Sequence, residues 1–235
     1  MTREGPVVAV VPAYNEEEAV GDVVRALLAL PFAVEVVVVD DGSADRTAER
    51  ARAAGAHVLR PAFNLGIGGA VQTGWMWAAR RGARAAIQVD GDGQHPASEV
   101  GKVLAPVLEG RADVAIGSRF LREDGVHGDR STGARRAGMN WLAFLVRLRS
   151  GRRFTDPTSG LRAFGPAALA WLAATYPEDY PEPQILAPLV RKGFLVEEVP
   201  VAMRARAGGQ SSIRGLAPVL YMTKVSVSLL LGSMK

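Results

Sequence analysis

Short apolar runs, each followed by a longer segment of helical periodicity, recur along this 235-residue chain and constrain its fold more than any other feature. The runs include β-branched residues and end at glycine, proline or aspartate, which is typical of buried strands. Predicted strands cover residues 7–11, 34–39, 57–60, 85–89, 112–117 and 194–203, with a turn and a further short strand within 155–164. Predicted helices cover about 20–30, 45–54, 66–81, 96–108, 134–149, 166–175 and 182–191, with Asn15 and Asp45 capping the first two. This alternation predicts right-handed βαβ units, and hence an α/β fold with a mostly parallel central sheet and helices on both faces.

The length and composition of the chain limit its organisation and its chemistry. A chain of this length can bury one sizeable core, so one domain is expected. The sequence contains no cysteine, which excludes disulfides, thiolate metal sites and cysteine nucleophiles. The first apolar run, residues 7–11, is too short for a signal peptide and is followed at once by Pro12. We therefore expect a cytoplasmic protein.

Acidic residues directly follow two of the predicted strands. Asp41 follows one strand, and Asp90 and Asp92, separated by a single glycine, follow another. Ligands of parallel sheets bind beyond the carboxyl ends of the strands, so these residues and Tyr14, which follows the first strand, are expected around one crevice. Two neighbouring carboxylates repel unless they share a cation, and hard oxygen ligands suit Mg²⁺ or Mn²⁺. The alternative for Asp90 and Asp92 is an ordinary Asp-Gly turn in a solvated loop.

The two halves of the chain differ in charge. Residues 1–118 carry 11 basic and 15 acidic side chains, whereas residues 119–235 carry 17 basic and 9 acidic ones. The positive second half predicts an anionic partner such as a phosphate, a membrane surface or a nucleic acid. The helix at 134–149 has an apolar body flanked by arginines, which fits either a core helix with a charged rim or a helix on a membrane surface. Residues 216–232 are apolar but short for a bilayer span, so a docked or interfacial helix is expected there.

Four motifs in a fixed order resemble those of the GT-A glycosyltransferases of family 2. They are Val-Pro-Ala-Tyr-Asn-Glu at 11–16, Val-Asp-Asp-Gly-Ser at 39–43, Asn-Leu-Gly-Ile-Gly-Gly-Ala at 64–70 and Asp-Gly-Asp-Gly-Gln-His-Pro at 90–96. Within the family the chain is most similar to the polyprenyl-phosphate (dolichyl-phosphate) mannosyl- and glucosyltransferase branch, which Gly-Ser-Arg at 117–119 and Asp-Pro-Thr-Ser-Gly at 156–160 also resemble. The resemblance covers residues 6–214 and implies a GT-A catalytic domain at 1–214, followed by an apolar helix at 215–235.

The resemblance also implies roles for the matching residues. The residues implied in binding a nucleotide-diphosphate sugar are Pro12, Ala13, Tyr14, Glu16, Asp41, Gly66, Gly69, Asp90, Gly91, Gln94, Arg204, Arg206 and Ser211. Asp90 and Asp92 match the Asp-x-Asp motif that holds Mg²⁺ or Mn²⁺ on the donor diphosphate, and this makes Asp92 a catalytic residue. The metal neutralises charge on the departing nucleotide.

The acceptor determines which further residues the reaction needs. A polyprenyl phosphate arrives ionised and needs cations, which Arg119, Arg135 and Arg136 could supply. A sugar hydroxyl of a polysaccharide or glycoconjugate needs a general base instead, for which Asp156 and Glu182 are the candidates. We expect metal-dependent transfer of a hexose to a polyprenyl phosphate, with inversion, by a peripheral protein at the inner face of the plasma membrane. A polar, glycine-rich loop at 120–134 is expected to close over the substrate.

Other classes of protein explain less of the sequence. A dinucleotide dehydrogenase carries Gly-x-Gly-x-x-Gly after its first strand, where this chain has Pro-Ala-Tyr-Asn-Glu. A non-enzymatic basic protein on a membrane or nucleic acid leaves the acidic strand ends without a role, and no nucleic-acid partner is expected. The base and sugar of the donor, the choice between Mg²⁺ and Mn²⁺, and a homo-oligomer or membrane-protein partner are left open by the sequence.

Overall fold

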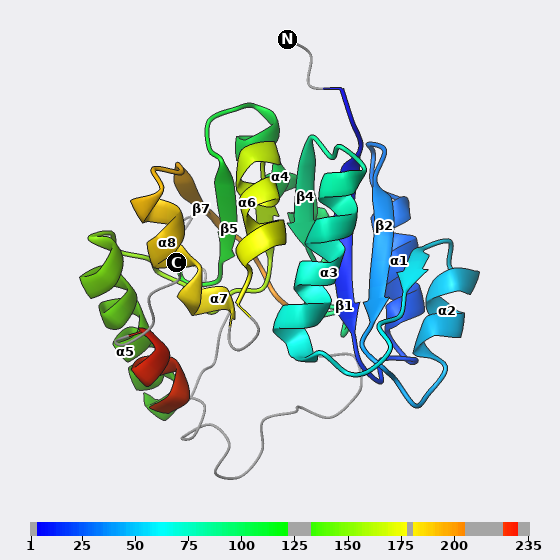
Figure 1. Ribbon diagram of the computed structural model, residues 1–235, viewed down its shortest axis with the longest axis horizontal. Helices are drawn as coiled ribbons and strands as arrows, with labels where there is room; N and C mark the ends of the chain where they lie inside the picture. The colour runs from blue at the N-terminus through cyan, green and yellow to red at the C-terminus, as the bar shows by residue number, and fades with distance from the viewer. Residues whose placement is uncertain (1–3, 122–132, 178–180, 205–222, 230–235) are drawn as a thin grey trace.

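The structure is a computed structural model that describes residues 4–121, 133–177, 181–204 and 223–229. In the described part of the chain, seven strands form one sheet in the order β3-β2-β1-β4-β6-β5-β7 (Figure 1). They are β1 (Val7–Ala13), β2 (Glu35–Asp40), β3 (His57–Leu59), β4 (Ala85–Gln88), β5 (Val114–Ser118), β6 (Arg162–Phe164) and β7 (Val196–Pro200). Every neighbouring pair is parallel except those of β6, which runs antiparallel to both β4 and β5. The predicted mostly parallel sheet is confirmed, with one reversed strand that the pattern did not indicate.

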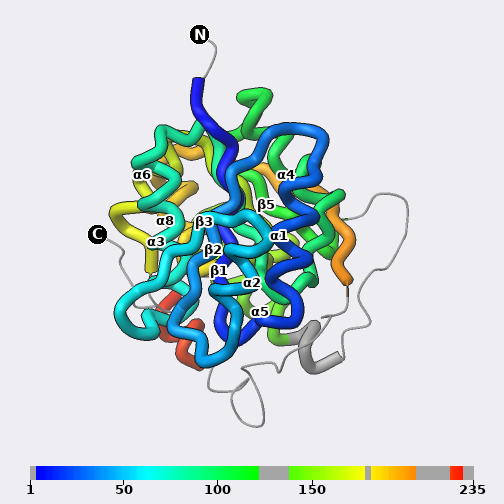
Figure 2. The backbone as a smooth tube through the Cα atoms, turned by 90° about the vertical axis from the view of Figure 1, so that its right-hand side faces the viewer, coloured from blue at the N-terminus to red at the C-terminus, as the bar shows by residue number. Residues whose placement is uncertain are grey.

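Helices cover both faces of the sheet, as predicted. They are α1 (Val20–Leu28), α2 (Thr47–Ala53), α3 (Gly66–Arg80), α4 (Ala97–Leu108), α5 (Gly133–Ser150), α6 (Pro166–Thr175), α7 (Pro181–Gln184) and α8 (Leu186–Arg191). Side chains of α3, α5, α6 and α8 belong to the same core cluster as Val8 and Val10 of β1, whereas those of α1, α2 and α4 belong to a second cluster with Val7, Ala9 and Val11. Figure 2 shows α3, α6 and α8 on one side of β1–β3 and α1 and α4 on the other. The strands are apolar throughout because both faces are buried.

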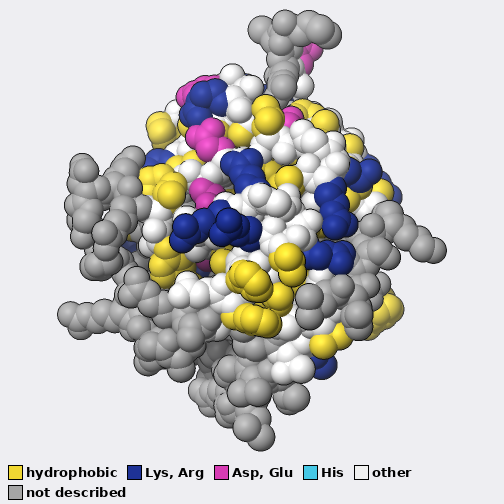
Figure 3. Space-filling model, turned by 90° about the vertical axis from the view of Figure 1, so that its left-hand side faces the viewer, with side chains coloured by type: hydrophobic (Ala, Val, Ile, Leu, Met, Phe, Trp, Pro, Cys, Tyr) yellow, Lys and Arg dark blue, Asp and Glu magenta, His cyan; other side chains and the backbone are white. Residues whose placement is uncertain are grey.

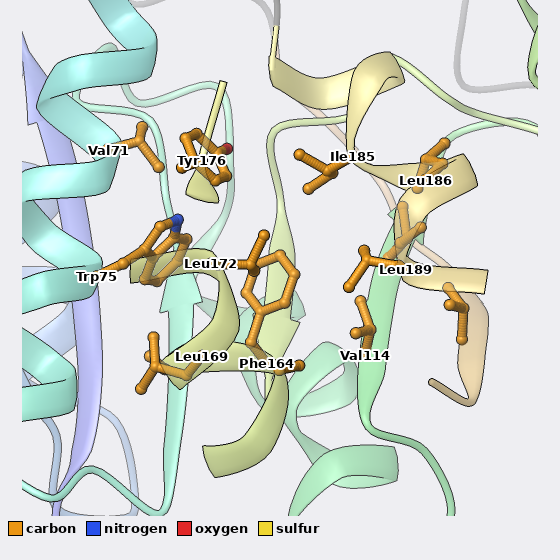
Figure 4. Packing of buried hydrophobic residues seen from close by; sticks show 14 of the residues in the cluster. Val71, Trp75, Val114, Phe164, Leu169, Leu172, Tyr176, Ile185, Leu186 and Leu189 are labelled. Carbon is orange, nitrogen blue, oxygen red and sulfur yellow. The ribbon is translucent and has the colours of Figure 1, made fainter. Parts of the chain in front are cut away.

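Trp75 lies at the centre of the core on the α3 side. Its ring is fully buried and meets Phe164 edge to face, with ring centroids 5.1 Å apart (Figure 4). The preceding Gly74 lets α3 approach β1, since a Cβ there would lie 2.1 Å from Cγ1 of Val10. This close packing fixes the start of α3 beside the carboxyl end of β1.

Two segments of the second half differ from the simple prediction or extend it. The single helix predicted at 182–191 is two short helices, α7 and α8, because Pro188 has no N–H to donate to the carbonyl of Gln184, where α7 ends. Residues 223–229 are helical and lie beside α5, where Nε1 of Trp141 donates to Oγ of Ser226 at 2.9 Å. In the described ranges, no helix is long and apolar enough to cross a membrane.

Candidate active site

A cavity of about 510 Å³ lies beyond the carboxyl ends of β1, β2 and β4, which are neighbours in the sheet. The loops after these strands line it, together with the start of α3 and with α7. The lining residues are Pro12, Ala13, Tyr14, Glu16, Asp41, Asn64, Gly66, Ile67, Ala70, Asp90, Gly91, Asp92 and Glu182. The predicted strand-end motifs therefore meet in one place. Asn64, Ile67 and Ala70 also line the cavity, although they were not predicted as site residues. The only sequence signal for them was their place in the motif at 64–70.

The loop after β1 is fixed by the loop after β2. The backbone N–H of Asn15 donates to Oγ of Ser43 at 2.9 Å, and Oδ1 of Asn15 accepts from the N–H of Ala44 at 2.9 Å. Asn15 has a φ of 54°, a left-handed conformation that asparagine tolerates. The predicted helix cap at Asn15 is therefore wrong, because its side chain holds the neighbouring loop and α1 begins later, at Val20. As a result the Tyr14 ring, 52% exposed, stands at the cavity, available to stack on a flat ligand.

Asp41 is buried where the loop after β2 meets the start of α3. Its Oδ1 accepts from the N–H of Leu65 at 2.7 Å, and its backbone carbonyl accepts from Nδ2 of Asn64 at 2.8 Å. Burial raises the pKa of the Asp41 carboxyl, and the Leu65 N–H partly offsets this. Gly66 has a φ of 75°, and a Cβ at this position would have no atom within 4 Å, so glycine allows the turn and leaves the cavity open. Gly69 instead packs against Leu65 and does not line the cavity.

Asp90 and Asp92 flank Gly91 on the loop after β4. Asp92 is buried and its Oδ1 accepts from the N–H of Gln94 at 3.0 Å, whereas about a third of the Asp90 side chain, 35%, is exposed. In the ranges that the structure describes, no group of three or more His, Cys, Asp or Glu could hold a metal ion by itself. Two carboxylates fit a Mg²⁺ or Mn²⁺ ion that takes its other ligands from water and a bound phosphate, the usual arrangement for Mg²⁺.

The Asp90 carboxylate is enclosed by two further residues. His95 is buried, and its Nδ1 accepts from the backbone N–H of Asp90 at 3.1 Å. Since Nδ1 accepts, the ring N–H is on Nε2, which lies 3.7 Å from Oδ2 of Asp90. A Cβ at Gly160 would lie 3.0 Å from both carboxylate oxygens. The sequence pattern indicated neither contact.

Arg119 and Asp156, which were predicted for different roles, bind each other. Nε and Nη2 of Arg119 lie 2.7 and 2.8 Å from the two carboxylate oxygens of Asp156, which is fully buried. Nη2 also donates to Oγ1 of Thr158 at 3.1 Å. Neither residue lines the cavity. A carboxylate engaged by a guanidinium at both oxygens is poorly suited to accept a substrate proton, which argues against Asp156 as a general base.

Glu182 is held at the cavity by a buried arginine that the sequence pattern did not indicate. Nη1 of Arg162 donates to the Glu182 carbonyl at 2.6 Å, while Nε and Nη2 donate to the carbonyls of Ser159 and Pro157, each at 2.7 Å. Burial lowers the pKa of Arg162. Burial also raises the pKa of the Glu182 carboxyl, against the opposing effect of the Arg162 charge. Of the two candidate bases, only Glu182 faces the cavity.

The remaining predicted residues lie beside the cavity or outside the described residues. The Gln94 carbonyl accepts from the N–H of Arg204 at 3.0 Å, which brings the start of the basic segment to the loop of Asp90 and Asp92. Arg206, Ser211 and the loop at 122–132 lie outside the described residues. Arg135 and Arg136 are in the first turn of α5, but their side chains are also outside the description.

Residues 8–165 match the family described as Glycosyl transferase family 2. Polyprenol monophosphomannose synthase of Mycolicibacterium smegmatis is 32% identical to this chain over 216 residues, which cover 88% of this chain and 80% of that protein. UDP-N-acetylglucosamine–dolichyl-phosphate N-acetylglucosaminyltransferase of Methanococcus voltae is 30% identical over 181 residues, which cover 70% of this chain and 71% of that protein.

A solved structure shares the fold. The crystal structure of glucosyl-3-phosphoglycerate synthase from Mycobacterium tuberculosis in complex with Mg²⁺ and UDP has a TM-score of 0.72 and 22% identity, covering 97% of this chain and 78% of that one. Another crystal structure of that synthase contains Mn²⁺, UDP and glucosyl-3-phosphoglycerate.

Proposed function

Because the chain belongs to glycosyl transferase family 2, and is thus a glycosyltransferase with the GT-A fold, we propose that it moves a hexose from a nucleotide-diphosphate sugar to a polyprenyl phosphate. The proposed transfer depends on a divalent metal and inverts the anomeric carbon. The observation that carries the proposal is the meeting of Asp90 and Asp92 with Tyr14 and Asp41 around one cavity. A nucleotide diphosphate needs groups that bind its base, such as Tyr14 and Asp41, and carboxylates that hold a metal on its phosphates, such as Asp90 and Asp92, in one site.

The nucleoside would lie between the loops after β1 and β2. The exposed ring of Tyr14 can stack on the base, and the buried carboxylate of Asp41 can accept a hydrogen bond from a base N–H. Pro12, Ala13 and Gly66 leave room for the ligand to approach the backbone. The cavity volume is within the range of small-ligand sites, about 300–1,000 Å³.

The diphosphate would lie against the loop after β4. Asp90 and Asp92 would hold the metal, which, when bound, neutralises charge on the leaving nucleotide. His95 holds the Asp90 backbone by a hydrogen bond, and Gly160 leaves the space that the Asp90 carboxylate occupies. The segment that starts at Arg204, hydrogen-bonded to Gln94, would bring Arg206 and Ser211 to the diphosphate as the remaining part of the clamp.

A lipid phosphate is the acceptor that best fits the residues at the end of β5. Two relatives carry names that specify transfer to dolichyl phosphate or synthesis of a polyprenol monophosphomannose. An ionised phosphate needs cations but no base, and Asp156 is engaged by Arg119. Asp156 holds the Arg119 guanidinium in one orientation, and Arg135 and Arg136 would add positive charge at the start of α5.

A hydroxyl acceptor is the second candidate, and Glu182 is the observation that favours it. Glu182 lines the cavity, and burial raises the pKa of its carboxyl in the direction that a general base requires. The Glu182→Gln variant separates the two acceptors. Loss of a general base lowers kcat by about 100-fold or more, whereas a lipid phosphate acceptor should leave kcat within a few-fold of the wild type.

The proposal extends to organisation and location. We infer a catalytic domain at 1–214 with an apolar helix after it, and peripheral attachment to the inner face of the plasma membrane, where a polyprenyl phosphate can be reached. A homo-oligomer or a membrane-protein partner is compatible with this arrangement.

A donor and acceptor assay tests the proposal. The protein would be incubated with UDP, GDP or dTDP sugars, Mn²⁺ or Mg²⁺ and a short-chain polyprenyl phosphate in detergent, with and without EDTA. One donor should give a glycolipid of inverted configuration, and EDTA should abolish the product. The Asp90→Asn variant should lose activity, and Asp22→Asn, an exposed carboxylate on α1, should retain it. Undiminished transfer in EDTA or in Asp90→Asn would contradict the proposed metal role.

A further inference from the structure

The outer face of α5 carries an apolar patch that is separate from the donor cavity. The patch consists of Trp141, Phe144, Leu148 and Val227, which are between 48% and 65% exposed. Trp141, Phe144 and Leu148 are three and four residues apart and therefore share one helix face. The rings of Trp141 and Phe144 stack with centroids 5.9 Å apart. We call these four residues the α5 patch.

The α5 patch is part of an ordered arrangement of two helices. Figure 1 shows the helix at 223–229, in red, lying alongside α5. The Trp141–Ser226 hydrogen bond joins the two helices, and Val225 and Leu229 are buried while Val227 points outward. The neighbouring face of α5 buries Leu142, Leu145 and Val146 in the core. The inner face of α5 is thus a core face, as one of the two sequence interpretations expected, and the outer face is left exposed.

Positive charge surrounds the α5 patch. Residues 133–155 contain six arginines and no acidic residue, and residues 199–235 contain no acidic residue either. Arg147, Arg152, Arg153 and Lys224 are exposed, and none of them forms an ion pair with another described residue. Figure 3, which views this side of the molecule, shows hydrophobic side chains gathered next to groups of Lys and Arg. Basic side chains beside exposed apolar ones are complementary to a lipid bilayer, which has phosphate groups at its surface and an apolar interior.

We propose that the α5 patch docks the protein on an anionic lipid bilayer. The four apolar side chains would enter the acyl region, and the arginines and Lys224 would lie at the lipid phosphates, as in amphipathic helices that lie in a membrane plane. The inference rests on the proposed function in one respect: docking would bring the enzyme to a lipid acceptor. The contact itself follows from the exposed aromatic rings and from the exposed basic side chains of Arg147, Arg152, Arg153 and Lys224.

Vesicle flotation tests the docking. Wild-type protein should float with vesicles of phosphatidylcholine containing 30% (roughly one lipid in three) phosphatidylglycerol, and much less with phosphatidylcholine alone. Phe144→Glu and Leu148→Glu should each lower the partition onto vesicles by about tenfold or more. Each substitution replaces an apolar side chain that would enter the bilayer by a negatively charged one. Leu28→Glu is the matched control, because Leu28 is 43% exposed in the last turn of α1, a helix on the other face of the sheet. It should float like the wild type.

Fluorescence gives a second measurement. Vesicles should shift the tryptophan emission to the blue, and the Trp141→Phe variant, which keeps the other three tryptophans, should lose this shift. Thermal stabilisation by nucleotide sugar and Mn²⁺ should be the same in Leu148→Glu and wild type, so failure of docking is distinguishable from failure of the proposed function. Three results would overturn the docking surface: no binding of the wild type to anionic vesicles, wild-type binding by Leu148→Glu, or a wild-type dimer that Leu148→Glu converts to a monomer. The last result would identify the patch as an interface between copies.

Discussion

Replacing Gly160 by alanine should impair the metal-binding loop without disturbing the fold. A Cβ at Gly160 would lie 3.0 Å from both Asp90 carboxylate oxygens and 3.2 Å from Nε2 of Gln88, whereas ordinary contacts begin at 3.4 Å. The carboxylate must therefore retreat by about 0.4 Å, the difference between these contact distances. A displacement of about 1 Å in a catalytic site lowers the rate on the order of 100-fold. If the increase in activation free energy is proportional to the displacement, a shift of about 0.4 Å lowers the rate roughly sixfold. Gly160 is not among the residues with positive φ, so alanine adds no backbone strain and restricts the unfolded chain.

Initial rates measured over a range of Mn²⁺ concentrations, together with urea unfolding, test this prediction. Gly160→Ala should need more Mn²⁺ for half-maximal rate and should unfold at or above the wild-type midpoint. Gly101→Ala is the control, because Gly101 is in α4 and the nearest atom to its added Cβ would be Cε1 of Phe32 at an ordinary 3.6 Å. That variant should keep the wild-type rate and gain up to about 1 kcal/mol of stability. A Gly160→Ala enzyme with wild-type rate and Mn²⁺ dependence would refute the idea that the position of the Asp90 carboxylate governs metal binding.

Three further changes test other parts of the site. Asp92→Asn should abolish the thermal stabilisation that donor and Mn²⁺ give together while leaving the unliganded melting temperature within a few degrees of wild type; retained stabilisation would remove Asp92 from the metal site. Arg119→Met should lower the free energy of unfolding by about 3 kcal/mol, because Asp156 would be left buried without its partner, and urea unfolding that matches the wild type would show that the pair does not hold this region. Glu182→Gln should stabilise the protein at pH 7. The pKa of Glu182 is raised above its ordinary 4.5, so the folded state binds this proton more tightly than the unfolded state. The stability of the wild type therefore falls as the pH rises from 4.5 through the pKa of the folded state. The advantage of Glu182→Gln should vanish in unfolding experiments below pH 4.5, and an equal advantage at both pH values would contradict the sign.

Much of the fold could be predicted because it follows from burial on both faces of the sheet. Residues 36–39 are four consecutive buried valines, a pattern that a parallel sheet covered by helices produces and a half-exposed sheet does not. The direction of β6 could not be predicted, since Arg162–Phe164 has only three residues and its orientation depends on β4 and β5 on either side. The break between α7 and α8 was also missed, because the apolar spacing at 182–191 continues across both prolines and so predicts a single helix.

The donor half of the site was largely predictable, and the other half was not. Tyr14, Asp41 and Asp90 follow strands that are neighbours in the sheet, so topology alone brings them to one edge. The pairing of Arg119 with Asp156 joins residues 37 positions apart through two irregular segments, and no periodicity encodes it. The contact of Arg162 with the Glu182 carbonyl spans 20 positions and exists only because β6 is inserted between β4 and β5.

The two halves of the cavity are held by different forces. The strand ends that carry Asp41 and Asp90 are fixed by apolar packing on both faces of the sheet. Glu182, which also lines the cavity, is held by Arg162, whose three hydrogen bonds reach carbonyls in two separate segments. A buried guanidinium is costly to desolvate. An apolar side chain in its place would leave three carbonyls without a donor, which costs stability as well. Arg162 therefore both satisfies these carbonyls and sets the position of Glu182.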